Sequence, residues 1–238
     1  MGKLVLKNSR VWIDGTDLTG DIHALNLELG KDLPAATTMG SNGVREYESG
    51  LRFASFAHSC YFRDDGAADA ALAGLLGSTT SQIVSISPDG AQEGGVIWTA
   101  PGWVASHQPF AGQIGELAKV ELAGTTTGDL VRATLLNSAD TTQTSDGNGS
   151  AQQVGAVASD ELAVAVFHVL EISGTLTVTV DSDDASGMAS PTTRFTFNAA
   201  TSPGAQRLVL SGPVTDDWWR ASWTLTGSAK FAVMIGIV

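Results

Sequence analysis

Hydrophobic and polar residues alternate in short runs over most of the chain. In "DIHALNLELG", Leu25, Leu27 and Leu29 fall on one face, while Asn26 and Glu28 fall on the other. A period of two residues is typical of a β-strand with one face against a core and the other in water. The same alternation recurs in "VLKNSRVWIDGTDLTG", which predicts two strands joined by a turn at Asp14-Gly15.

The C-terminal segment "DDWWRASWTLTGSAKFAVMIGIV" also has the pattern of strands. From Trp219 to Leu225 every second residue is apolar, which predicts one wet face. Gly227 and Ser228 predict a turn. The run from Phe231 to the end is apolar at nearly every position, so we expect that strand to be buried on both faces.

One stretch has the period of a helix. In "DDGAADAALAGLLG", residues 64–77, alanines and leucines recur every three or four positions. Asp64 or Asp65 is suited to cap the start, and Gly77 to end it.

Two segments lack any period. "KDLPAATTMGSNGVREYESG", residues 31–50, predicts a loop of a length that is usually functional or mobile. Residues 135–159 are rich in Ser, Thr, Gly and Gln, contain no Lys or Arg, and predict a linker. We therefore expect a mainly β protein with two domains, residues 1–133 and residues 134–238. Evenly spaced short strands predict that the second is an antiparallel β-sandwich, Ig-like or jelly-roll-like.

The composition restricts the possible partners. Charged residues make up only 16% of the chain, and 13 Lys and Arg against 25 Asp and Glu give a net charge of −12. This sign opposes direct binding to phosphates or anionic lipid. Cys60 is the single cysteine and excludes an internal disulfide. No apolar run is long enough for a signal peptide or a membrane anchor, so we expect synthesis in the cytoplasm.

The sequence shows no common catalytic or nucleotide-binding motif: the phosphate-binding loop, the G-x-S-x-G elbow and H-E-x-x-H are all missing. Cys60 and His58 share a strand face, but a lone buried cysteine usually acts as a small hydrophobic residue. The four histidines lie in separate segments without metal-ligand spacing. We therefore predict no enzyme activity, no catalytic residues, no metal site and no cofactor.

Two polar or aromatic clusters leave alternatives open. "DSDDASG", residues 181–187, fails the calcium-loop pattern at Ala185, Ser186 and Thr192, so we predict a solvated hairpin turn, with an adventitious calcium site as the alternative. Trp218 is out of phase with the neighbouring tryptophans, and an exposed tryptophan can stack on a sugar. Glycan or host-surface binding through Trp218 is therefore the alternative function.

The order of these elements resembles the major tail tube proteins of long-tailed bacteriophages. The similarity lies in a strand, a long loop with "LPAATTMGSNG", a strand, an Ala/Leu helix, further strands and "GTTTGDLVRATLL". The C-terminal "VDSDDASGMASPTTRFTFNAAT", "GPVTDDWWRASWTLTG" and "FAVMIGI" resemble the β-sandwich appended to many phage tail proteins.

This resemblance implies a structural virion protein made in the host bacterial cytoplasm. Residues 1–133 would be a tail tube domain, a β-sandwich or barrel with one short helix, and residues 134–238 a decoration domain. Six copies would form a ring, and stacked rings would form a tube that meets other tail proteins at its ends and conducts DNA without binding it specifically. The expected lumen-facing residues are Asn26, Glu28 and Arg52. The residues expected to contact neighbouring subunits or rings are Leu33, Pro34, Thr37, Thr38, Met39, Asn42 and Arg45.

Overall fold

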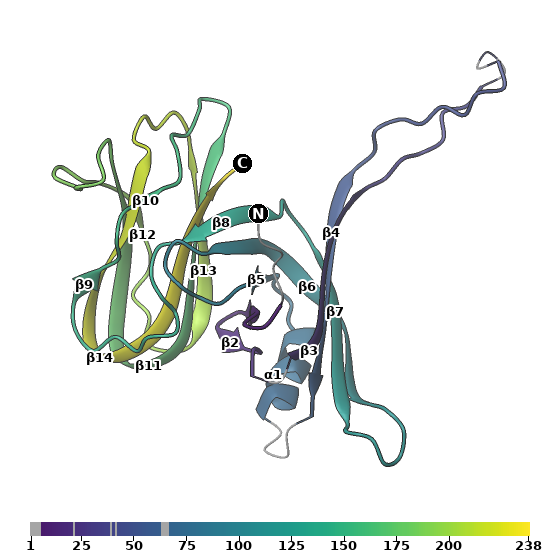
Figure 1. Cartoon of the computed structure of the whole chain (residues 1–238), viewed down its shortest axis with the longest axis horizontal. Helices are drawn as coiled ribbons and strands as arrows, with labels where there is room; N and C mark the ends of the chain where they lie inside the picture. Colours follow the sequence, from purple (N-terminus) through teal and green to yellow (C-terminus); the bar gives the residue numbers. More distant parts are fainter. Residues whose placement is uncertain (1–5, 21, 39, 41, 63–66) are drawn as a thin grey trace. The chain divides into compact units, whose positions relative to one another are not determined.

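The computed structural model describes residues 6–20, 22–38, 40, 42–62 and 67–238. Its described part is mainly β with one helix, as predicted (Figure 1). The elements in chain order are β1 (Arg10–Ile13), β2 (Thr16–Asp17), β3 (Ile22–Lys31), β4 (Arg52–Tyr61), α1 (Ala67–Leu76), β5 (Gln82–Ser87), β6 (Val96–Ala111), β7 (Lys119–Thr126), β8 (Val131–Leu135), β9 (Gly147–Asn148), β10 (Gln152–Gln153), β11 (Leu162–Asp183), β12 (Thr192–Thr196), β13 (Gly204–Ser211) and β14 (Trp218–Ile237).

The chain folds into two compact units that do not follow the predicted division after residue 133. The reason is that β1, β5 and the start of β6 join the C-terminal strands through the pairings β5–β6, β6–β8 and β8–β14. Unit 1 comprises Met1–Gly20, Gln82–Ala100 and Val131–Val238, and unit 2 comprises Asp21–Ser81 and Pro101–Leu130.

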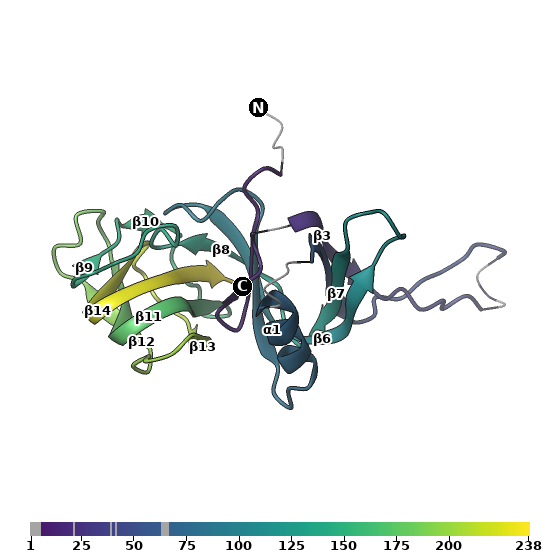
Figure 2. The same cartoon turned by 90° about the horizontal axis from the view of Figure 1, so that it is seen from below.

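Unit 1 is built on a long two-stranded ribbon. β11 and β14 pair antiparallel over almost their whole lengths, from Ala163 opposite Ile237 to Asp183 opposite Trp218. They curve side by side through the unit (Figures 1 and 2). β12 and β13 pair with β11, while β8, β9 and β10 pair with β14.

The core of unit 1 lies on both faces of this ribbon. One cluster contains the fully buried Phe167, Trp219 and Phe231. A second cluster on the opposite face includes Trp12 and Met234. The last run of the chain is therefore buried on both sides, as its unbroken apolar sequence predicts.

Gly227 does not form a turn, contrary to the prediction. It lies inside β14, directly opposite Gly174 of β11, and the two strands stay paired on either side of this glycine pair, with one register shift between Val169 and Glu171. Both glycines have left-handed φ angles, 106° at Gly174 and 88° at Gly227. The turn prediction failed because glycine adopts a left-handed φ inside strands as well as in turns, so the residue type alone does not distinguish the two.

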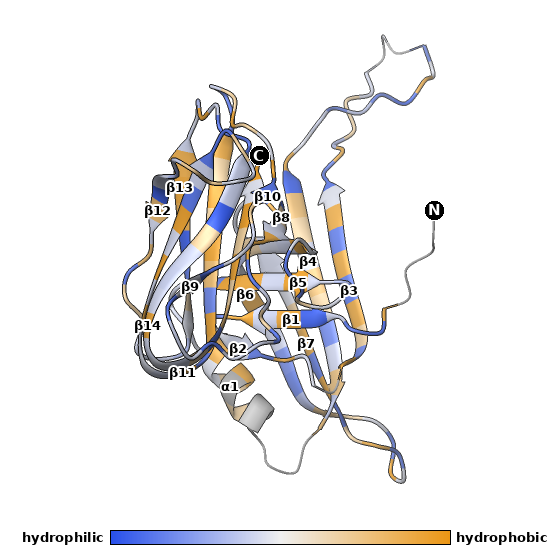
Figure 3. Cartoon of the chain, turned by 60° about the vertical axis from the view of Figure 1, so that its left-hand side comes forward, coloured by the Kyte–Doolittle hydropathy of each residue, from blue (hydrophilic) through white to orange (hydrophobic). Residues whose placement is uncertain are grey.

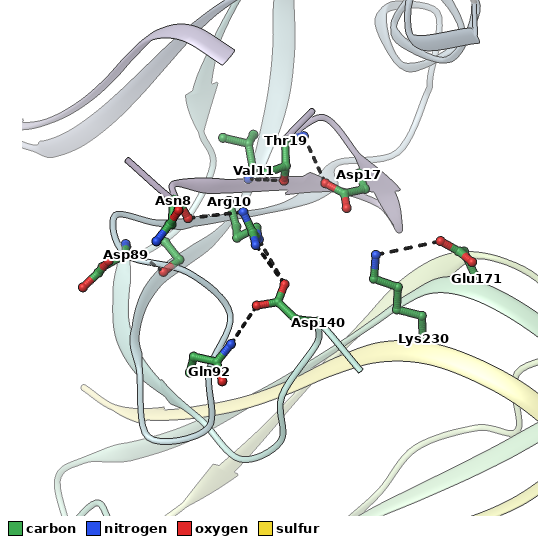
Figure 4. A network of polar contacts seen from close by, with 11 residues as sticks. Asn8, Arg10, Val11, Asp17, Thr19, Asp89, Gln92, Asp140, Glu171 and Lys230 are labelled. Atoms are coloured by element: carbon green, nitrogen blue, oxygen red, sulfur yellow. Dashed lines mark hydrogen bonds and ion pairs between the residues drawn. The ribbon is translucent and has the colours of Figure 1, made fainter. Parts of the chain in front are cut away.

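The prediction that residues 135–159 form a linker is also wrong, because this polar segment is part of unit 1 and packs within it. Leu136 is fully buried, and the Asn137 side chain donates to the Phe231 carbonyl at 2.8 Å and accepts the Val233 amide at 2.7 Å. Asp140 accepts hydrogen bonds from Arg10 at 3.0 and 3.2 Å and from Gln92 at 2.8 Å (Figure 4). The polar side chains of this segment thus form hydrogen bonds to backbone and charged groups of unit 1, and the segment is not a solvated linker.

Unit 2 contains a four-stranded antiparallel sheet in the order β3-β4-β7-β6, with β6 contributing residues 102–111. Helix α1 lies beside it (Figures 1 and 2). The helix ends at Leu76 and Gly77 is in a turn, as predicted, whereas the predicted capping residues Asp64 and Asp65 lie outside the described residues. Alternate residues of β4, among them Phe56 and Cys60, form the buried face of the sheet.

Candidate assembly interface

The second face of the unit 2 sheet, which we call the polar face, carries mostly polar and small side chains together with a few aromatic ones. Cross-strand pairs place Asn26 beside Ala57, Ala57 beside Ala123, and Ala123 beside Ser106, so these residues share one face. Hydrophilic and hydrophobic residues alternate along β3 in Figure 3, as expected for a strand with two different faces. The residues on this polar face are Ala24, Asn26, Glu28, Gly30, Phe53, Ser55, Ala57, Ser59, Tyr61, Trp103, Ser106, Gln108, Lys119, Glu121, Ala123 and Thr125.

Two of the three residues predicted to line a lumen lie on this polar face. Asn26 and Glu28 are exposed there, and their cross-strand partners are Ala57 and Ser55. Arg52 does not share this face. It is three residues from Ser55 and two from the buried Ala54, so its side chain leaves β4 on the same side as the buried residues. Its guanidinium lies 3.2 Å from the Asp129 carboxylate, and both side chains are exposed.

The polar face is slightly hollow and carries little positive charge. A shallow depression of about 410 Å³ is lined in part by Asn26, Ser59 and Glu121. The face carries the carboxylates of Glu28 and Glu121, and at one end the Lys119 ammonium beside Tyr61, whose ring packs against the His23 ring. A phosphate backbone meets no basic cluster here, so this surface is unsuited to holding nucleic acid.

The sheet of unit 2 has two open edges. Among the described residues of unit 2, β3 pairs only with β4, and residues 102–111 of β6 pair only with β7. Because neighbouring strands alternate in direction, β3 and β6 run antiparallel to each other. Long unpaired edges are prone to uncontrolled association, and proteins usually cover or pair them. β6 has register shifts between Val104 and Ser106 and between Gln108 and Ala111, and Pro109 lies within the second, so its edge is irregular at these two places.

The predicted loop between β3 and β4 is a two-stranded arm that projects beyond the sheet (Figures 1 and 2). Asp32 donates its amide to the Leu51 carbonyl at 2.9 Å, and the Glu48 amide donates to Pro34 at 3.0 Å. Farther out, Thr37 accepts the Glu46 amide at 3.0 Å through its hydroxyl. The arm buries neither of its faces. Its sequence therefore does not alternate between polar and apolar residues as that of a half-buried strand does.

The residues predicted to contact neighbouring subunits all belong to this arm, and nearly all of its described side chains are exposed. Exposed apolar residues are unusually dense there: Leu33, Val44, Tyr47 and Leu51 are each more than half exposed. The predicted contact residues Leu33, Pro34, Thr37, Thr38, Asn42 and Arg45 are described and exposed, and Met39 lies outside the described residues.

The acidic segment 181–187 is more ordered than the predicted solvated turn. β11 continues to Asp183, and both Asp181 and Asp183 are buried acceptors. Asp181 accepts the hydroxyls of Thr193 and Ser222, each at 2.7 Å. The hydrogen bond from the Ser190 amide holds the pKa of Asp183 below its usual value. Only the residues from 184 onward form the exposed turn.

Trp218 is half-buried at the start of β14, where it pairs with Gln153 and Asp183. His58 and Cys60 lie together on the buried face of β4, as their spacing predicts. Neither residue presents a reactive group to solvent.

A buried polar chain around His168 was missed in the sequence, because its members come from separate strands. His168 Nδ1 accepts the Gly15 amide at 3.3 Å, so the ring proton is on Nε2, which donates to Ser85 Oγ at 2.8 Å. Ser85 donates in turn to Thr99 at 2.8 Å. Burial lowers the pKa of His168 to about 3, and the ring is neutral. This serine–histidine pair is sealed in the core and serves packing.

The described residues contain no cluster of three His, Cys, Asp or Glu side chains placed to hold a metal ion. No helix in this part of the chain has the length and apolarity to span a membrane.

No protein-family model and no curated protein matches the sequence. Several solved structures do. A chain in the virion of a native gene transfer agent particle is 21% identical, with 55% of this chain and 98% of that chain covered and a TM-score of 0.44. A chain of the sheath–tube complex of an extracellular contractile injection system is 8% identical, with 55% and 90% covered and a TM-score of 0.41. The SPP1 Dit protein, from the hub adsorption apparatus of phages infecting Gram-positive bacteria, is 15% identical, with 98% and 100% covered and a TM-score of 0.38.

Proposed function

We propose that the protein is a tail tube subunit, of which six copies join edge to edge into a ring, and that stacked rings form a tube that conducts DNA. One observation carries the proposal: the unit 2 sheet has two open edges that run antiparallel to each other and a polar face free of basic clusters. The number six comes from the sequence resemblance.

The strand directions permit a continuous assembly. β6 of one copy placed beside β3 of the next continues the antiparallel alternation, because the sheet has an even number of strands. Such a contact joins two different edges and is therefore head-to-tail, the type that closes into a ring when the rotation per subunit is suitable. A closed barrel leaves no edge unpaired.

The polar face supplies the inner wall in this arrangement. Asn26 and Glu28 would line the lumen, and DNA would slide past a neutral to acidic wall because no counterions are released by tight phosphate contacts. The buried face of the sheet, with Phe56 and Cys60, remains inside the subunit. The arm then extends along the strand direction, beyond the end of the barrel, toward the next ring.

The edge contact has a direct test in solution. The Asp32 amide points to the partner strand, so by alternation the Leu29 amide, three residues away, points to the open edge. Leu29→Pro removes that donor without breaking the β3–β4 ladder, and Leu29→Ala is the matched control. In sedimentation velocity we expect wild type and Leu29→Ala to form a species of about six times the 24.6 kDa chain mass, and Leu29→Pro to stay monomeric. A wild-type protein that is monomeric at all concentrations, or a Leu29→Pro variant that assembles normally, would contradict the edge contact.

A further inference from the structure

Asparagine followed by glycine occurs twice in the chain, at Asn42-Gly43 and at Asn148-Gly149. In this dipeptide the glycine backbone nitrogen can reach the asparagine side chain, because glycine has no Cβ atom to hinder the approach and moves through many backbone conformations. Asparagine is for this reason among the chemically labile residues of proteins. The two dipeptides share the same local chemistry, so any difference in their reactivity comes from the fold around them.

Asn42 and Gly43 lie in the turn of the arm, between Thr37 and Glu46, where the Glu46 amide donates to the Thr37 hydroxyl at 3.0 Å. Both residues of the dipeptide are exposed and have left-handed φ angles, 47° at Asn42 and 80° at Gly43. A Cβ atom on Gly43 would meet no other atom within 4 Å. Among the described residues, neither the Asn42 side chain nor the Gly43 amide makes a hydrogen bond. No contact therefore holds the attacking nitrogen away from the side-chain carbonyl carbon.

The second dipeptide also has an exposed asparagine, but its backbone is fixed. Asn148 belongs to β9 and pairs with Ser222 of β14. The Gly149 amide donates to the Ala221 carbonyl at 2.9 Å, and a Cβ atom on Gly149 would lie 1.9 Å from the Leu136 carbonyl oxygen. Before it can attack, the Gly149 nitrogen must leave its hydrogen bond and move within a packed region, which costs free energy.

Aspartate followed by glycine reacts by the same route, and the described part of the chain contains three such pairs. A hydrogen bond holds each of them. The glycine amide donates in Asp14-Gly15, to His168 at 3.3 Å, and in Asp89-Gly90, to Asn8 at 2.7 Å, and the carboxylate accepts in Asp146-Gly147, from Leu225 at 2.7 Å. Within the described residues, Asn42-Gly43 is thus the one pair of this kind that no hydrogen bond restrains.

We propose that Asn42 is a site of spontaneous deamidation, at which the arm is modified without an enzyme. The Gly43 nitrogen loses its proton to solvent and bonds to the side-chain carbonyl carbon of Asn42. The bond from that carbon to Nδ2 breaks, and ammonia leaves after taking a proton from water, so that a cyclic imide remains. Water then opens the ring at either carbonyl. One opening gives aspartate, and the other gives isoaspartate, in which the main chain runs through the former side chain.

The reaction changes the arm in two ways. A neutral amide becomes a carboxylate, so the chain gains one negative charge three residues before Arg45. In the isoaspartyl form the main chain also gains one carbon atom within the turn, which then no longer matches the left-handed φ angles of Asn42 and Gly43. Newly made and aged copies of the protein therefore differ in the arm, whether or not the proposed function is correct.

Peptide mass spectrometry of the folded protein, aged in mildly alkaline buffer, tests the proposal. Asn42 should convert to the acid about tenfold faster than Asn148 or more, because Gly149 must first give up its hydrogen bond. In protein unfolded by guanidinium chloride the two sites should react at similar rates, since both are asparagine followed by glycine. Equal rates at the two sites of the folded protein, or no conversion at Asn42, would overturn the proposal.

Two matched variants provide an independent test by anion-exchange chromatography. Glutamine forms the corresponding ring far more slowly than asparagine. Asn42→Gln should therefore abolish the more acidic species that appears first as the wild type ages, whereas Asn148→Gln should leave it unchanged. Circular dichroism checks that both variants are folded. An early acidic species that persists in Asn42→Gln would show that the reaction lies elsewhere in the chain and would overturn the assignment.

Discussion

Gly174 and Gly227 face each other across the ribbon of β11 and β14, and both backbones are left-handed. A Cβ atom on Gly174 would lie 1.8 Å from the Thr226 carbonyl oxygen, and one on Gly227 would lie 1.9 Å from the Ser173 carbonyl oxygen. Neither position accepts a side chain without movement of the opposite strand. The pairing of the two strands at this level therefore depends on glycine in both, and core residues before and after the glycine pair belong to one cluster.

Replacing Gly174 with alanine should destabilise unit 1. The substitution combines an unfavourable φ with a backbone clash, so we expect a loss of about 2–4 kcal/mol in the free energy of unfolding. Gly204→Ala is the matched control, because a Cβ there meets no atom within 4 Å. Urea unfolding followed by tryptophan fluorescence measures both variants. Equal stabilities for the two would show that the ribbon does not require glycine at position 174.

Acid should weaken the protein through His168. Its folded pKa of about 3 is below the ordinary value of 6.5, so the unfolded chain takes up a proton first as the pH falls. The stability contributed by the neutral ring is complete above pH 6.5 and is lost progressively between pH 6.5 and 3. Each pH unit within this window costs about 1.4 kcal/mol.

His168→Gln should remove this component of the pH dependence. Between pH 7.5 and pH 5, wild type should lose roughly 2 kcal/mol more stability than the variant, whose side chain does not titrate. Urea midpoints at the two pH values give the comparison, and the contributions of the other histidines cancel because both proteins contain them. Parallel stability profiles would mean that His168 is protonated in the folded state.

Asp140 should contribute to stability although it lies in a segment with the composition of a linker. Its carboxylate joins Arg10 and Gln92, and the Arg10 and Asp140 side chains are partly buried. Asp140→Ala should cost about 1 kcal/mol, and a double-mutant cycle with Arg10→Ala should show coupling. The control is Asp160→Ala, in an exposed turn. If both aspartates prove equally dispensable, the segment is not tied to β1.

The charge of the polar face should control the passage of DNA through assembled tubes. Asn26→Lys with Glu28→Lys places basic side chains on the proposed inner wall, so tubes of this variant should retain short duplex DNA at low salt and release it at high salt. The control carries the same charge change elsewhere, as Ser186→Lys with Asp184→Lys. Fluorescence anisotropy reports retention. Equal retention by both variants would place Asn26 and Glu28 outside the lumen.

Removing the arm should separate stacking from folding. Deletion of residues 34–43 takes away only its outer part, where nearly all described side chains are exposed, so subunits should remain folded and soluble. Circular dichroism checks the fold, and electron microscopy checks the assembly. Tubes that persist without these residues would show that the arm is not an axial contact.

The sequence predicts best those strands whose pattern of polar and apolar residues follows directly from which of their faces are buried. Alternation along β3 places Asn26 and Glu28 on one face, and the apolar end of β14 is buried on both sides. Arg52 lies on the opposite face from Asn26 and Glu28, which the sequence does not reveal because the phase of β4 relative to β3 is set by cross-strand register.

Other features depend on contacts between distant segments and leave no local signal. The polar chain from Gly15 through His168 and Ser85 to Thr99 joins four separate strands or turns. Residues 135–159 have the composition of a linker, yet Asn137 supplies two hydrogen bonds to β14. A polar composition indicates that a segment is exposed on average. It does not reveal that one of its polar side chains forms hydrogen bonds with buried backbone groups.

Negative-stain electron microscopy of the purified protein at rising concentration tests the central claim most directly. The claim predicts rings with a central hole, followed by stacked tubes as the concentration increases, and neither from Leu29→Pro. Compact particles without a hole at every concentration would contradict it.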